Sequence, residues 1–74
     1  MSALDGGDNT TAAARFTAFL AVHPRDARAE DAAYLRVIAL QRANDTNGMK
    51  EAAEQYLRRY PKGFRRAEVE TLSR

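Results

Sequence analysis

The sequence predicts an all-α fold in which about four helices form a row of antiparallel hairpins. Three observations support this prediction. The two prolines of the 74-residue chain, Pro24 and Pro61, stand 37 positions apart, and each should end a helix near the residue before it. Apolar residues recur every three or four positions, which is the spacing of one helical face. No segment alternates apolar and polar residues as a half-buried strand would.

The expected helices cover residues 9–22, 27–42, 46–59 and 64–73. Joints of only a few residues make sequential helices antiparallel. Asn44 tolerates the left-handed backbone that ends the second helix, and Gly63 is free to adopt the turn that follows Pro61. Each of the first three helices has a side-chain oxygen at its start that can accept a hydrogen bond from a free backbone N–H. The residues are Asp8 or Asn9 for the first helix, Asp26 for the second and Asp45 for the third.

An internal repeat is indicated by shifting the chain 37 positions against itself. The shift matches the two prolines and several aromatic, aliphatic and basic residues around them. The matched pairs are Phe19 with Tyr56, Leu20 with Leu57, His23 with Tyr60, Arg25 with Lys62, Arg28 with Arg65, and Leu35 with Leu72.

The apolar pattern predicts which side chains form the core. Residues 32–40 are apolar on nearly every side, so the second helix should be the most buried. The third helix has a single apolar stripe that runs from Met49 to Tyr60. The residues expected to be largely buried are Phe16, Phe19, Leu20, Tyr34, Leu35, Ile38, Tyr56 and Leu57.

The composition excludes most enzyme chemistry. The 8.2 kDa chain holds no Cys and one His, so few nucleophiles or metal ligands exist. We therefore expect no catalytic activity, no cofactor and no metal. No apolar run is long enough to span a membrane, so a soluble chain is expected, and the compartment, periplasm or cytoplasm, stays open.

Two polar features have a structural interpretation that outweighs a functional one. His23 lies on the apolar stripe before Pro24 and matches Tyr60, which favours a structural role at a helix end. A basic run holds five of the 12 basic residues and could attract phosphate. It lacks the Gly-rich or aromatic-interleaved pattern of a nucleic-acid module, so a solvated edge is the preferred interpretation. Its members are Arg58, Arg59, Lys62, Arg65 and Arg66.

Several segments resemble the tetratricopeptide (TPR) repeats, particularly the long-period type of bacterial envelope proteins. The resemblance covers residues 7–72, and its carrying segments are Gly7-Asp8, Phe19-Leu20, His23-Pro24, residues 31–35, Asn44-Asp45 and residues 56–61. It implies a solenoid fragment of alternating A and B helices over residues 9–74, preceded by a tail over residues 1–8. The 37-residue period lies between those of TPR and HEAT repeats, so a HEAT-like array or a simple four-helix bundle stays open.

The resemblance implies a non-catalytic protein-interaction module that is a scaffold fragment of a larger bacterial protein. Its A helices would line a groove for a protein or peptide. The alternatives are a structural spacer or self-association domain and, more weakly, nucleic-acid binding through the basic run. A homodimer is expected, built on the outer face of the first helix or on Phe64, Val69 and Leu72 of the last. The groove-lining positions implied by the resemblance are Asp31, Tyr34, Ile38 and Gln41.

Overall fold

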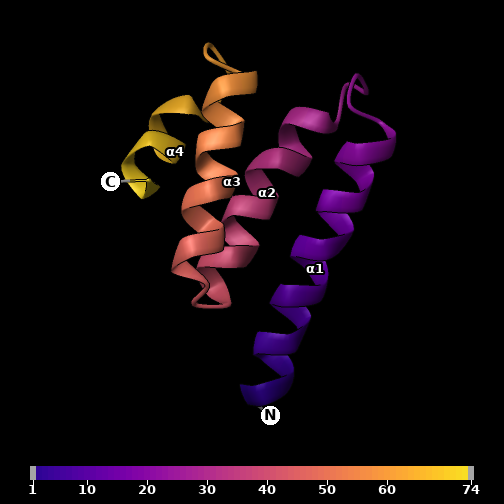
Figure 1. Cartoon of the computed structure of the whole chain (residues 1–74), viewed down its shortest axis with the longest axis vertical. Coiled ribbons are helices and arrows are strands. Elements are labelled where there is room, and N and C mark those ends of the chain that lie inside the picture. Colours follow the sequence, from indigo (N-terminus) through magenta and orange to yellow (C-terminus); the bar gives the residue numbers. More distant parts are fainter. Residues whose placement is uncertain (1, 74) are drawn as a thin grey trace.

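The computed structural model describes the backbone of residues 2–73 and the side chains of residues 8–73. Within this range the chain forms four helices and no strand: α1 (Ser2–Val22), α2 (Ala29–Arg42), α3 (Thr46–Arg59) and α4 (Arg66–Leu72). The helices lie side by side in chain order, with α1 and α4 at opposite edges (Figure 1), in a slab of 37 × 28 × 16 Å. The predicted all-α class is confirmed.

The first helix begins earlier than the sequence predicted. Helix α1 begins at Ser2 rather than at residue 9, so the segment expected as a tail is helical from Ser2 onward. Asp8 and Asn9 lie inside the helix and do not cap it. Since no proline precedes Pro24, nothing stops the helix from extending toward the N-terminus, where each added residue contributes one backbone hydrogen bond.

The other helix ends mostly follow the predicted local signals. The Asp45 side chain accepts a hydrogen bond from the Gly48 N–H at 2.9 Å and caps α3. Asn44 has a φ of 61°, the left-handed conformation expected there. Asp26 does not cap α2 directly, because its carboxylate accepts from the N–H of Arg28, at 2.8 Å, before the helix begins.

The joints around Pro24 and Pro61 have the same backbone hydrogen bonds at an offset of 37. In each joint four carbonyls accept from N–H groups three or four residues later. The ring pairs at the two helix ends also match, with centroids 5.2 Å apart for Phe19 and His23 and 5.3 Å apart for Tyr56 and Tyr60. The matched bonds join Phe19 to His23, His23 to Asp26, Asp26 to Ala29 and Arg28 to Ala32 in the first joint, and Tyr56 to Tyr60, Tyr60 to Gly63, Gly63 to Arg66 and Arg65 to Val69 in the second.

The core is built mainly from alanine. Seven of the ten buried apolar residues among those described are Ala, and the only larger ones are Val37, Tyr56 and Val69. Five buried residues lie on α2, which confirms that the second helix is the most buried. Small side chains let the helix axes approach closely, so helices with few large apolar residues still exclude water from their contact.

The predicted core is only partly correct. Tyr56 is buried as expected, whereas the other aromatic residues of the predicted set are half-buried. Leu35 is 42% exposed, so the expectation that it is buried is wrong. No described helix covers the side of α2 on which Leu35 lies, and an apolar residue is buried only where a neighbour covers it.

Candidate functional site

The four residues implied as groove-lining lie on α2 but do not act together. Asp31 and Gln41 are exposed, and Ile38 is half-buried. Tyr34 is engaged with α4: its hydroxyl donates to Glu68 Oε2 at 2.9 Å, and the Arg65 guanidinium lies 5.0 Å from its ring centroid. Asp31 lines a depression in the surface.

That depression lies between α1 and α2 and has a volume of about 420 Å³. Its floor is apolar and its rim is charged. The apolar side chains are Phe16, Phe19, Ala32 and Leu35, and the charged ones are Arg15, Arg28 and Asp31. The sequence predicted Phe16, Phe19 and Leu35 as core, whereas the two phenylalanines are half-buried and Leu35 is exposed.

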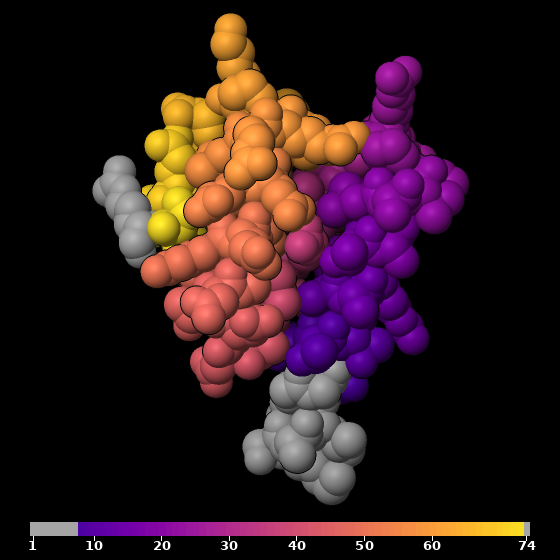
Figure 2. Space-filling view, in the orientation of Figure 1, coloured from indigo at the N-terminus to yellow at the C-terminus, as the bar shows by residue number. Residues whose placement is uncertain are grey.

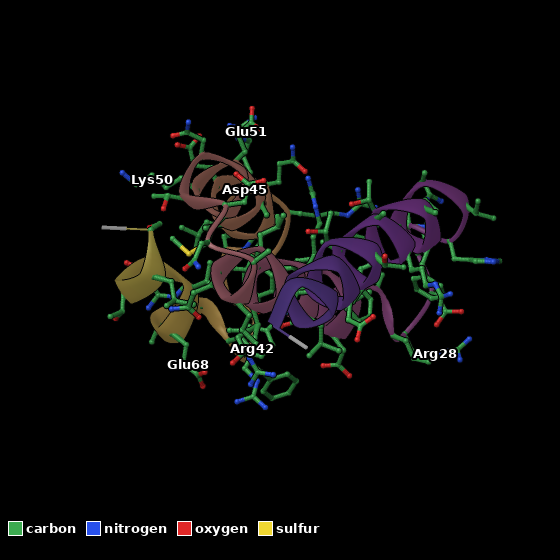
Figure 3. All side chains as sticks on the ribbon, turned by 90° about the horizontal axis from the view of Figure 1, so that it is seen from below. Arg28, Arg42, Asp45, Lys50, Glu51 and Glu68 are labelled. Carbon is green, nitrogen blue, oxygen red and sulfur yellow. The ribbon has the colours of Figure 1, made fainter. Side chains whose placement is uncertain are left out.

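The rim is held in place by local interactions. Arg28 Nε lies 3.2 Å from Asp26 Oδ1, and its guanidinium lies 5.5 Å from the Phe19 ring centroid. Hydrogen bonds from the Arg28 side chain and backbone lower the pKa of Asp26. The Asp26 carboxylate is therefore ionised at neutral pH and pairs with Arg28 of the rim. In Figure 3, Arg28, Arg42 and Glu68 point to one side of the molecule, opposite Asp45, Lys50 and Glu51.

A second hollow, a furrow of about 580 Å³, lies between α1 and α3 with α2 at its floor. Figure 2 shows this face, where the side chains of α1 and α3 flank the little of α2 that is visible. Two arginines cross it: Arg36 Nη1 donates to Gln55 Oε1 at 2.6 Å, and Arg59 Nη2 donates to the Pro24 carbonyl at 2.8 Å. Polar contacts within the protein thus already use two of the cations of this furrow.

A compact hydrogen-bond cluster joins α2 to the α3–α4 joint. Glu30 Oε2 accepts from the Tyr56 hydroxyl and from the Phe64 N–H, both at 2.7 Å. The same hydroxyl accepts from the Arg65 N–H at 3.0 Å. Burial and the bond to Glu30 raise the pKa of Tyr56 to about 12, so it stays neutral. Every group in the cluster has a partner, which indicates a structural role.

Gly63 makes this cluster possible through space rather than through an unusual backbone angle. Its φ is not positive. A Cβ on Gly63 would come within 2.6 Å of the Tyr56 hydroxyl and closer still to Glu30 Oε2. The sequence analysis assigned Gly63 to turn formation, whereas its function here is to leave room for a carboxylate from another helix.

The basic run is largely engaged within the protein. Arg58 lies 3.8 Å from Glu54, Arg65 pairs with Glu68 at 2.9 Å, and Arg66 pairs with Glu70. Because acidic side chains one helical turn away offset these charges, the run presents less free positive charge than its sequence suggested. His23 is exposed and contacts Phe19 at the end of α1.

The dimer surface expected on the last helix is wrong in its composition. Val69 is fully buried and Leu72 packs against the core, so neither can form the centre of an exposed patch. Of these three residues, Phe64 is the one that is exposed, at 98%.

Among the described residues, no three His, Cys, Asp or Glu side chains gather as a metal site would require. None of the helices, as far as they are described, is long and apolar enough to cross a membrane. Comparison of the chain with known protein families, curated proteins and solved structures finds no match. The α1–α2 depression is therefore the candidate functional site.

Proposed function

We propose that the chain is a non-catalytic protein-interaction module and that the α1–α2 depression is its docking site. One observation carries the proposal: Phe16, Phe19 and Leu35 form an apolar floor that no described helix covers. An apolar floor with a charged rim is the usual anatomy of a protein-binding surface. The TPR-like resemblance supports the same function, and the bacterial scaffold origin that it implies belongs to this proposal.

The test uses selection followed by a matched pair of variants. A displayed library of helical peptides is selected on the wild-type protein, and the affinities of the ligands are measured by fluorescence polarisation. Leu35→Glu places a charge in the floor, whereas Val22→Glu places one on a more exposed apolar residue that does not line it. We expect Leu35→Glu to weaken binding by about tenfold or more, since burying a charge costs more than one apolar contact contributes. Val22→Glu should leave binding unchanged.

Circular dichroism checks that both variants keep the helical fold, which the exposure of both positions predicts. Ligands that bind both variants equally well, or a selection that yields no ligand, would contradict the proposal. In that case the alternatives, a spacer or a self-association domain, would explain the chain better. Light scattering over a concentration series measures the expected homodimer directly.

A further inference from the structure

We infer that the α1–α2 depression accepts one kind of partner: an amphipathic helix from another protein that carries a tyrosine and, three residues later, an aliphatic side chain. One turn before the tyrosine this helix carries no carboxylate. The inference rests on the proposed function and names the chemistry of the ligand. Its basis is the internal repeat, because the corresponding surface of the second hairpin is already covered by a helix of the chain, α2.

Every residue that lines the depression has a counterpart 37 positions later, in the second hairpin. Five of the seven residues found 37 positions later pack in one apolar cluster with Ala33, Tyr34 and Val37 of α2. The other two, Arg65 and Glu68, contact the Tyr34 side chain. Helix α2 therefore shows on which side a helix would lie, and Arg15 and Phe16, which replace the buried Ala52 and Ala53, would hold that helix farther from α1 than α2 lies from α3. The seven counterparts are Ala52, Ala53, Tyr56, Arg65, Glu68, Val69 and Leu72.

The residue types that hold Tyr34 recur in the first hairpin, where Arg28 at present pairs with Asp26 and lies over the Phe19 ring. Arg28 stands where the second hairpin has Arg65, and Asp31 stands where it has Glu68. Both side chains line the depression. A tyrosine on an incoming helix can donate its hydroxyl to Asp31 while the guanidinium of Arg28 lies over its ring, as Arg65 does over Tyr34. These contacts favour tyrosine over phenylalanine or leucine.

The contacts that hold Glu30 are not preserved. In the second hairpin the Glu30 carboxylate lies beside Gly63 and binds the Tyr56 hydroxyl. The first hairpin has Asp26 in place of Gly63 and Phe19 in place of Tyr56. A Cβ on Gly63 would meet Glu30 Oε2, so the matching Asp26 places its carboxylate, which binds Arg28, near the region that a Glu30-like carboxylate would enter. Like charges would meet there without a hydroxyl donor, so an acidic residue at this position of the partner is disfavoured.

A second copy of the chain is a poorer occupant than a foreign helix. If copies stacked head to tail, α4 would take the position of α2, with Thr71 in place of Tyr34 and Glu70 in place of Ala33. Thr71 lacks the aromatic ring that the Arg28 site accepts, and Glu70 would bring a charge to an apolar contact. The depression therefore fits a helix that the described chain does not itself provide.

The test uses stapled peptides with the sequence of residues 29–42, because an isolated helix of this length is marginal in water. The staple joins the peptide positions of Leu35 and Ala39, which lie on the side away from the proposed contacts. Three peptides are compared by fluorescence polarisation: one with the native Glu30, one with Glu30→Gln, and one with Glu30→Gln and Tyr34→Ala. We expect the Glu30→Gln peptide to bind best and the other two to bind about tenfold more weakly.

A variant of the protein itself turns the test into a gain of binding. Phe19→Tyr combined with Asp26→Gly recreates in the first hairpin the surroundings that Glu30 has in the second. This variant should reverse the preference and bind the native Glu30 peptide more tightly than the Glu30→Gln peptide. An unchanged preference, or equal binding of the Tyr34→Ala peptide, would overturn the inference.

The outcomes separate this inference from the proposed function. Peptides that bind without these preferences, yet lose binding to the protein variant Leu35→Glu, would overturn the inference and leave the interaction module standing. The inference would also be overturned, and the interaction module would stand, if the library yielded Leu35-dependent ligands while no stapled peptide bound. A homodimer that Leu35→Glu dissociates would overturn the foreign partner in favour of a second copy. Absence of any Leu35-dependent ligand would overturn both proposals.

Discussion

Replacing Tyr56 by phenylalanine tests the hydrogen-bond cluster that joins α2 to the α3–α4 joint. The change keeps the buried ring but removes the hydroxyl that donates to Glu30 at 2.7 Å and accepts from Arg65 at 3.0 Å. A hydrogen bond to a charged group contributes about 1.5–3 kcal/mol and a neutral one about 0.5–1.5 kcal/mol. We therefore expect the free energy of unfolding to fall by roughly 2–4 kcal/mol, a large share of what a domain of this size has.

The other two tyrosines are matched controls, because all three lie in the same small domain and differ in their hydroxyl contacts. The Tyr34 hydroxyl makes one hydrogen bond at an exposed position, so Tyr34→Phe should cost less than Tyr56→Phe. The Tyr60 hydroxyl is buried and meets no hydrogen-bond partner in the described part of the chain. Tyr60→Phe should therefore leave stability unchanged or raise it slightly.

Urea unfolding followed by circular dichroism measures all three variants against the wild type. The expected order of stability loss is Tyr56→Phe, then Tyr34→Phe, then Tyr60→Phe. If Tyr60→Phe destabilised the protein as much as Tyr56→Phe, the loss could not depend on whether the hydroxyl has a hydrogen-bond partner, and the reasoning from hydrogen bonds would be refuted.

Four further predictions concern pH, the tight joint, a helix cap and the core. The pKa of Tyr56 rises from its ordinary value of about 10 to about 12 on folding. The stability that this shift contributes, up to about 3 kcal/mol, should be complete below pH 10 and lost as the pH rises toward 12. Tyr56→Phe should flatten this pH dependence in thermal melts. Gly63→Ala should lower the melting temperature, because the added Cβ would meet the Tyr56 hydroxyl. Lys62→Ala, at the exposed neighbouring position, should leave the melting temperature unchanged. Asp45→Ala should cost about 1 kcal/mol in urea unfolding through loss of the α3 cap, and an equal cost for Asp8→Ala, inside α1, would contradict the capping argument. Val37→Ala should destabilise by about 2 kcal/mol, more than Leu35→Ala despite the smaller deletion, because Val37 is fully buried and Leu35 is not.

Features that depend on local chemistry could be predicted from the sequence. The Asp45 cap, the left-handed Asn44 and the two proline joints each follow from a few adjacent residues, and the structure confirms them. The start of α1 could not be predicted in this way, because Asp8 is an equally good cap by sequence. Whether a potential cap is used depends on whether the helix stops there.

The candidate site depends on contacts between distant parts of the chain. Leu35 and Val37 are both aliphatic residues of α2, yet one is exposed and the other buried, because α3 lies on one side of α2 only. The bonds from Tyr34 to Glu68 and from Tyr56 to Glu30 join residues 34 and 26 positions apart. Periodicity identifies the face that can be buried, but only the arrangement of helices decides which part of that face is covered.

The alanine-rich interior also determines which substitutions the fold can tolerate. Most cores are damaged chiefly by truncation, because removal of a large side chain leaves a cavity. Of the ten buried apolar residues in the described part of the chain, seven have only a methyl group to lose, so few substitutions can create a cavity. Enlargement is the greater hazard, since a valine or leucine at Ala33 or Ala53 would push the helices apart. Substitutions that enlarge the buried alanines should therefore be the least tolerated in this protein.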